Sequence, residues 1–117
     1  MNISSRVEDD IAILNIAGRL DLTSATELKN ASRQFVTNGN CKLILNMGKV
    51  DFINSSGLGT LVSILKDVRS CHGRLKLSNL APYVKEIFEI TQLNNIFDIC
   101  EDEKHACNAL RETVAVQ

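Results

Sequence analysis

Within Val50-Asp51-Phe52-Ile53-Asn54-Ser55-Ser56-Gly57-Leu58-Gly59, an apolar strand passes directly into a helix. The apolar run over residues 43–47, just before it, is typical of a buried strand. After it, apolar residues recur at the spacing of a helix stripe, at Leu58, Leu61, Val62, Leu65 and Val68. Ser55 and Ser56 are therefore predicted at a helix N-terminus, where free backbone N–H groups and the helix dipole favour negative charge. A hydroxyl there either caps the helix or accepts a phosphate.

Upstream of this stretch, we expect two strands, over residues 3–7 and 11–16, around a polar turn. The second strand is apolar on both faces, which is typical of a strand that is covered on two sides. Gly18-Arg19-Leu20-Asp21 should break this strand. Ser24-Ala25-Thr26-Glu27 then has the pattern of a capping box that starts a helix, which Asn38-Gly39-Asn40 should end.

The central strand is expected over about residues 42–47, and the serine-led helix should end at Cys71-His72-Gly73. Four more elements are expected after it: a strand over 74–78, a helix from Pro82, a short strand over 96–99 and a helix from about Asp102 to Val114. Strands that alternate with helices of this length predict a single α/β domain over residues 1–117. Its mixed, mostly parallel sheet should have about five strands, with about four helices packed on it.

The composition restricts the kinds of partner. The 117 residues are 44% hydrophobic and 23% charged, with a net charge of -1, which is typical of a globular protein. Nucleic acid or an anionic membrane surface would need a concentrated basic face, and no run of like charges occurs. No stretch approaches the roughly 20 apolar residues of a membrane span, and the N-terminus lacks the apolar core of a secretory signal. We therefore expect a cytoplasmic protein that binds neither nucleic acid nor membrane.

The cysteines give no sign of a metal site. None of them approaches the C-x-x-C spacing of a zinc site, which would also need geometry from His72 or His105. We therefore expect no metal and no cofactor. The predicted state is four reduced, partly buried thiols, at Cys41, Cys71, Cys100 and Cys107.

Two chemical interpretations of the serine turn lack their partner residues. A hydrolase turn has the pattern G-x-S-x-G, but no glycine stands two places before Ser55 or Ser56. Its base would have to be His72, at the far end of the predicted helix, or His105, in the last helix. A Walker loop ends in Gly-Lys-Ser/Thr, whereas Thr60 follows the last glycine here. Neither a hydrolase nor a nucleotide-binding protein is favoured.

Two other interpretations of the serine turn remain open. In the first, Asn54 or Ser55 simply caps the helix, and Gly57 and Gly59 permit close packing on the sheet. In the second, one serine is a phosphorylation target. Its phosphate would carry about -1.5 to -2 charges, which the helix N-terminus stabilises, so the fold would stay intact. A partner docked on the turn would instead meet a dianion that has to be desolvated.

The stretch from Asp51 to Gly59, with the apolar helix after it, resembles the signature of STAS domains, specifically of bacterial anti-sigma factor antagonists. The resemblance extends to Gly18-Arg19-Leu20-Asp21, to Gly73-Arg74-Leu75-Lys76-Leu77 and to Ile87-Phe88-Glu89-Ile90-Thr91. It spans the whole chain, and it implies the same order of elements that the periodicity predicts.

The resemblance implies a regulatory binding protein rather than an enzyme. In this family, the unphosphorylated antagonist binds an anti-sigma factor that is also a GHKL-type serine kinase, and so releases a sigma factor. The kinase inactivates the antagonist by phosphorylating the second serine of the pair, and a PP2C-type phosphatase restores it. Here that residue is Ser56, with Ser55 as the less favoured alternative. The implied partner-binding residues are Asp21, Asn54, Ser55, Ser56, Gly57 and Leu58.

This chain departs from the family pattern at two positions. Members often carry aspartate where this chain has Asn54, and glycine where it has Gln92, at the end of a helix. Just before the turn, Phe52 and Ile53 are expected in the core rather than at an interface. STAS domains also serve as interaction subunits of stressosome-like or lipid-transport ABC complexes, which is the alternative function. The paired serines favour the switch.

Overall fold

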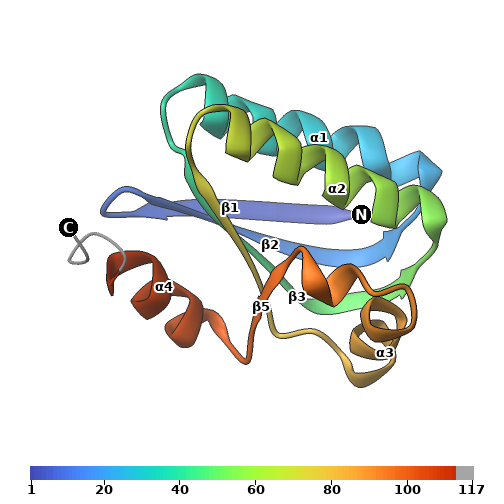
Figure 1. Ribbon diagram of the computed structural model, residues 1–117. Helices are drawn as coiled ribbons and strands as arrows, with labels where there is room; N and C mark the ends of the chain where they lie inside the picture. Colours follow the sequence, from blue (N-terminus) through green and yellow to red (C-terminus); the bar gives the residue numbers. More distant parts are fainter. Residues whose placement is uncertain (113–117) are drawn as a thin grey trace.

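The computed structural model describes residues 1–112, whose five strands form one sheet in the order β1-β2-β3-β4-β5. β1 (Asn2–Glu8) pairs antiparallel with β2 (Ile11–Leu20). β3 (Lys42–Ile53), β4 (Arg74–Ser78) and β5 (Asp98–Cys100) follow β2 in parallel (Figure 1). The expected α/β fold with a mixed, mostly parallel sheet is confirmed.

Helices cover both faces of this sheet. α1 (Leu22–Thr37) and α2 (Ser55–Ser70) lie side by side on one face, and α4 (Glu103–Glu112) covers part of the other (Figure 1). α3 (Pro82–Ile90) follows β4, with Pro82 in its first turn as expected, where the missing N–H needs no partner. No helix within the described part of the chain is long and apolar enough to span a membrane.

The core lies on both sides of the central strands. Alternate residues of β2 point in opposite directions: Leu14 and Ile16 pack with α1 and α2, whereas Ile11 and Ile13 pack with α4. All four side chains are at most 1% exposed. The expectation that this strand is covered on two sides is confirmed, because helices bury both of its faces.

The two central strands are longer than expected. β2 continues through Gly18 to Leu20, and β3 continues past Met47 to Ile53. Their parallel pairing persists along this extension, with register shifts on both sides of Gly18, whose φ is +110°. Glycine adopts this conformation at little cost, so the strand bends without ending. The expected break at residues 18–21 is wrong, and the strands carry the chain up to the starts of α1 and α2.

The start of α1 also differs from the expectation. Asp21 caps this helix, since its Oδ1 accepts hydrogen bonds from the Thr23 N–H at 3.1 Å and the Ser24 N–H at 3.3 Å. Ser24 Oγ accepts in return from the Asp21 N–H at 3.1 Å, which completes a capping box. The helix therefore begins at Leu22, and the predicted box from Ser24 to Glu27 is wrong. The carboxylate of Asp21 supplies the acceptor three residues earlier.

The last third of the chain follows the predicted order with shifted boundaries. A 3-10 turn at Leu93–Asn95 precedes β5, which begins at Asp98 rather than at residue 96. α4 begins at Glu103, where the Asp102 carboxylate accepts a hydrogen bond from the His105 N–H at 2.9 Å. The predicted end of this helix, at Val114, lies outside the described residues.

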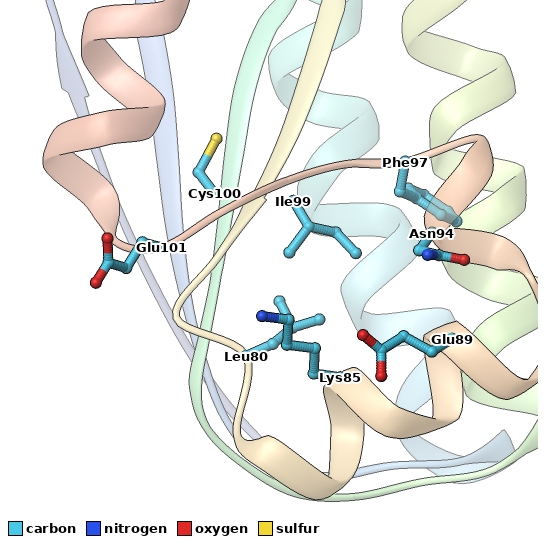
Figure 2. A pocket seen from close by; sticks show the side chains of 8 residues that line it. All are labelled: Leu80, Lys85, Glu89, Asn94, Phe97, Ile99, Cys100 and Glu101. Atoms are coloured by element: carbon cyan, nitrogen blue, oxygen red, sulfur yellow. The ribbon is translucent and has the colours of Figure 1, made fainter.

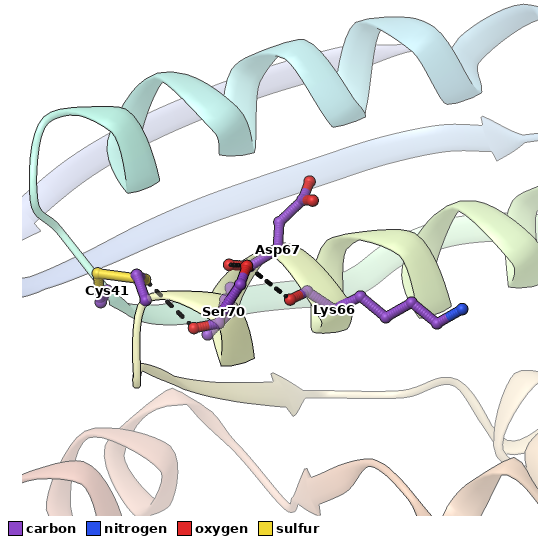
Figure 3. The surroundings of a disulfide bond; sticks show 6 residues. Cys41, Lys66, Asp67 and Ser70 are labelled. Atoms are coloured by element: carbon purple, nitrogen blue, oxygen red, sulfur yellow. Dashed lines mark hydrogen bonds between the residues drawn. A yellow bond between two sulfur atoms is a disulfide. The ribbon is translucent and has the colours of Figure 1, made fainter.

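The expectation of four reduced thiols is wrong for one pair. Cys41, just before β3, and Cys71, the C-terminal cap of α2, form a disulfide (Figure 3). These cysteines are 30 residues apart in sequence, but their Cα atoms lie 6.4 Å apart. Cys100 and Cys107 carry free thiols, as expected. The sequence held no signal for the pairing, because only the return of the chain from α2 into β4 brings the two ends together.

Candidate functional site

α1 and α2 begin side by side at the carboxyl ends of β2 and β3 (Figure 1). Leu20 pairs with Ile53 in the parallel sheet, so Asp21 and Asn54 are equivalent next residues of the two strands. Both have extended backbones, with φ of -134° and -123°, and each caps the helix that follows it. Parallel α/β sheets bind ligands at the carboxyl ends of their strands. The serine turn therefore lies at an edge where such folds place their binding sites.

Asn54, rather than a serine, caps α2. Its Oδ1 accepts a hydrogen bond from the Gly57 N–H at 3.1 Å, so Ser55 and Ser56 are the first and second residues of the helix. Ser55 is exposed and Ser56 is half-buried. Among residues 1–112, neither hydroxyl makes a hydrogen bond. Of the two caps that the sequence left open, the structure selects Asn54, and both serine hydroxyls stay unengaged.

Gly57 lets the first turn of α2 pack directly on the end of β2. A Cβ added there would lie 2.3 Å from the Leu20 carbonyl oxygen and 2.9 Å from its Cγ. The same carbonyl oxygen accepts a hydrogen bond from the Asn54 N–H at 3.4 Å. A Cβ on Gly59 would meet nothing within 4 Å. Close packing therefore requires glycine at position 57, and the same expectation for Gly59 is wrong.

The Asp21 carboxylate is committed to the start of α1. The N–H groups of Ser24 and Thr23, together with the Arg19 guanidinium, hold the pKa of Asp21 below its usual value of 3.8. Arg19 Nε lies 3.5 Å from Asp21 Oδ2, and the Asp21 side chain is 24% exposed. Asp21 thus lies beside the serine turn, as expected. Its carboxylate caps α1 and forms an ion pair with Arg19.

Arg19 also lies across the ring of Phe52, with its Cζ 3.8 Å from the ring centroid. Ile53 is buried, as expected, whereas Phe52 is half-buried beneath this guanidinium, so its expected place in the core is wrong. The same guanidinium also acts electrostatically on Tyr83, in the first turn of α3. Burial raises the pKa of Tyr83, the Asp51 carboxylate raises it further, and Arg19 opposes both effects.

The structure adds two exposed side chains to this edge that the sequence did not predict. Leu22 is 75% exposed and Tyr83 is 42% exposed. Leu22 is the first residue of α1 and Ser55 is the first residue of α2, and these two helices follow the paired strand ends Leu20 and Ile53. Sequence spacing could not reveal this exposure, because Leu22 lies three residues before Ala25 and fits the buried stripe of α1. Leu58, a predicted contact residue, is half-buried and packs against the core.

Both histidines of the chain lie away from the serine turn. His72 follows the C-terminal cap of α2, and a helix of 16 residues separates it from the turn by about 24 Å. His105 lies in α4, on the other face of the sheet, with its Nδ1 2.7 Å from Asp102 Oδ1. The Asp102 carboxylate raises the pKa of His105. Neither histidine therefore lies beside Ser55 or Ser56.

A hollow of about 540 Å³ lies between α3 and β5 (Figure 2). Its walls combine the apolar side chains of Leu80, Phe97 and Ile99 with the charged side chains of Lys85, Glu89 and Glu101. None of the residues predicted as site residues lines it. The hollow therefore contributes nothing to the site at the serine turn.

The chain is similar to known proteins in both sequence and fold. Residues 2–106 match the STAS domain family. The anti-sigma-B factor antagonist of Bacillus subtilis is 37% identical over 102 residues, which cover 85% of this chain and 92% of that protein. The crystal structure of Thermotoga maritima TM1081 has a TM-score of 0.88 at 26% identity, covering 93% of this chain and 94% of its own.

The Bacillus cell fate determinant SpoIIAA shares the fold in two states. Its unphosphorylated structure has a TM-score of 0.74 at 18% identity and covers 94% of this chain and 98% of its own. Its phosphorylated structure has a TM-score of 0.71 at 19% identity and covers 92% and 98%. In that protein, the same fold is found with and without the phosphate.

Proposed function

This chain belongs to the STAS domain family, and from that premise we propose that it is an anti-sigma factor antagonist, a regulatory binding protein without catalytic activity. The observation that carries the proposal is the pair of adjacent helix starts. Asn54 supplies the cap of α2, so the hydroxyls of Ser55 and Ser56 have no structural task there. At the start of the neighbouring helix α1, Leu22 offers an exposed apolar side chain to a docking protein.

Ser56 is the proposed phosphoacceptor, with Ser55 as the alternative. A phosphate on the second residue of α2 would lie beside the free N–H groups at the helix start, where the dipole favours an anion by about 0.3–1 kcal/mol. The start of α1 lies next to it and adds a second dipole of the same sign. Phosphorylation should therefore leave the fold intact, as it does in SpoIIAA.

The same phosphate changes what can dock on this edge. The unmodified surface has the apolar Leu22 and a charge-compensated pair, Arg19 with Asp21. A partner that fits this surface would have to desolvate a group of about -1.5 to -2 charges once Ser56 is modified. Burying an uncompensated charge costs several kcal/mol, so the modified chain should be released. Binding and release would then follow the state of one side chain.

The proposed partners follow from this switch. They are an anti-sigma factor with GHKL-type serine kinase activity and a PP2C-type phosphatase, and the proposed location is the cytoplasm. Besides Ser55, Ser56 and Asp21, the partner-binding residues would include Asn54, Gly57 and Leu58, which shape the start of α2. Because the Asn54 amide caps the helix as a carboxylate would, the kinase meets a turn that carries no charge at position 54.

The test is co-purification of the tagged chain from its native cells, with mass spectrometry of the intact protein. The expected result is a stoichiometric complex of an anti-sigma factor with the unphosphorylated chain, and one phosphoryl group on the unbound chain. Ser56→Ala and Ser55→Ala form a matched pair for labelling by the purified partner and ATP. Of these two variants, only Ser55→Ala should accept phosphate. If Ser56→Ala is labelled instead, the phosphoacceptor is Ser55. Co-purification with a transport ATPase or a stressosome-like assembly would favour the alternative function.

A further inference from the structure

The disulfide closes a segment that contains the whole serine turn. Cys41 precedes β3 and Cys71 caps the C-terminal end of α2, so the bond joins the two ends of the unit that presents Ser56 (Figure 3). Ser56 lies midway between the two cysteines in sequence. The bond itself lies at the far end of α2, about 24 Å from the serine turn for a helix of 16 residues.

The backbone holds these cysteines together independently of the sulfur bond. The Cys41 carbonyl oxygen accepts a hydrogen bond from the Arg74 N–H at 2.8 Å. A Cβ added to Gly73 would lie 2.0 Å from that same oxygen, so the chain leaving α2 packs against Cys41. Lys42 and Arg74, the first residues of β3 and β4, are paired in the parallel sheet. If the bond were reduced, the two thiols would remain within reach of each other.

Both redox states fit this site. A Cα separation of 6.4 Å lies within the range of protein disulfides. In the dithiol form, the Cys71 S–H has an acceptor, since its Sγ lies 3.2 Å from the Val68 carbonyl oxygen at the end of α2. Cys41 and Cys71 are half-buried and lie outside the apolar core clusters, so an attacking thiolate can reach them.

We infer that Cys41 and Cys71 form a reversible thiol–disulfide site through which a small cellular thiol, such as glutathione, sets the stability of the segment carrying the serine turn. In reduction, a glutathione thiolate attacks one sulfur, the protein S–S bond breaks, and the other cysteine leaves as a thiolate that takes up a proton. A second glutathione then attacks the mixed disulfide at the glutathione sulfur. The products are two protein thiols and one glutathione disulfide, and oxidation is the reverse.

The redox state should change stability and leave docking unchanged. A disulfide acts mainly by restricting the unfolded chain, and this one closes a 30-residue segment. The folded contacts of α2 with β2 and α1 do not involve the sulfurs, so the reduced chain keeps its fold and its serine edge. A cytosolic disulfide is commonly a transient, redox-responsive one, which agrees with the proposed compartment. The chain would then respond to thiol redox state in addition to phosphorylation.

The first experiment equilibrates the purified full chain with glutathione buffers of varying ratio, quenches it in acid, and alkylates it in denaturant. Of its 4 cysteines, 2 are free, so the oxidised chain should take up two alkyl groups and the reduced chain four. The expected result is a single transition between these two forms. Four groups at every ratio, two groups even in excess reduced glutathione, or a stable glutathione adduct would each overturn the inference.

The second experiment measures amide hydrogen exchange at the buried strand β3. Reduction should speed the slowest amides on the order of a hundredfold, because closing a segment of this length raises the folding constant by roughly that factor. Cys71→Ser keeps a donor for the Val68 carbonyl and should match the reduced chain under all conditions. Cys100→Ser, a matched control at a free thiol, should retain the redox-dependent difference. Equal exchange in both states of the unsubstituted chain would contradict the inference.

Neither experiment needs a partner or a phosphate. Failure of the redox inference is therefore distinct from failure of the proposed function.

Discussion

Asp21 and Asn54 occupy equivalent places in this molecule, each one residue beyond the paired Leu20 and Ile53, and each caps the helix that begins beside the other's. Because the two caps directly follow paired strand residues, α1 and α2 start at the same edge of the sheet. Since both helices begin at the same edge of the sheet, their positive ends lie together at the serine turn.

Replacing Asn54 should test its role as the cap of α2. Asn54→Ala removes the acceptor for the Gly57 N–H and should lower the free energy of unfolding by about 1 kcal/mol. Asn54→Asp keeps a cap and should stay close to the parent in urea unfolding, while it places a charge beside the serines. A loss of stability in both variants would mean that Asn54 acts through contacts other than its cap.

The glycines of the turn offer a matched pair. Gly57→Ala forces a Cβ to 2.3 Å from the Leu20 carbonyl oxygen and should destabilise the fold by about 1–3 kcal/mol, the usual range for overpacking. Gly59→Ala meets no neighbour within 4 Å and should stabilise the fold by about 0.5–1 kcal/mol, because alanine is the better helix former. Urea denaturation of both variants tests the pair, and equal effects would contradict the packing that we describe.

Gln92 adopts a left-handed backbone, with φ +61°, between α3 and the 3-10 turn. A residue with a Cβ costs roughly 1–2 kcal/mol in this conformation, and glycine avoids that cost. Gln92→Gly should therefore raise the free energy of unfolding by about 1 kcal/mol, whereas Gln92→Ala should not. An unchanged melting temperature for Gln92→Gly would show that its side chain contributes as much as its backbone costs.

Leu22 should be an anchor of the docking surface. Leu22→Ala removes an exposed apolar side chain beside the serine turn and should weaken the purified anti-sigma factor complex about five- to thirtyfold, an effect of about 1–2 kcal/mol. The fold should be unaffected because this side chain is outside the core. Ile90→Ala, at the end of α3 and 72% exposed, is the control and should leave calorimetric affinity unchanged. Equal weakening by both changes would argue against a docking role specific to Leu22.

The cap at Asp21 predicts a pH dependence. Its pKa is lowered in the folded chain by the N–H groups of Ser24 and Thr23 and by Arg19. A lowered carboxyl pKa contributes stability at pH values above the usual 3.8, and this contribution is lost as the pH falls through the folded value. Asp21→Asn keeps a capping oxygen but cannot titrate, so its unfolding free energy should fall less steeply than the parent's below pH 4. Parallel pH curves for the two proteins would contradict this assignment.

Elements with strong periodicity could be predicted because their signals are local. The stripe that begins at Leu58 identified α2, and the two apolar faces of residues 11–16 identified a strand covered by helices on both sides. The Ser55–Ser56 pair was placed at a helix start for the same reason. Each of these signals depends on neighbours within one or two turns of the chain.

Boundaries were less predictable because several residues could perform the same local task. Asp21 and Ser24 are both good caps, and the sequence alone did not reveal that Asp21 would take that place. Gly18 could end a strand or bend it, and the pairing with β3 decided that the strand continues. The roles of Gly57 and Gly59 could not be separated either, because only Gly57 faces the end of β2.

The sequence by itself determined the order of the elements, the two apolar faces of the sheet and the position of the serine pair at a helix start, because periodicity and capping act over a few residues. Only the tertiary structure decided that Leu22 is exposed at the start of α1, that the starts of α1 and α2 lie together, that Arg19 covers Phe52, and that Cys41 meets Cys71. These relationships join residues that are far apart along the chain. They depend on strand register and on the return of the chain through the sheet, which no local pattern encodes.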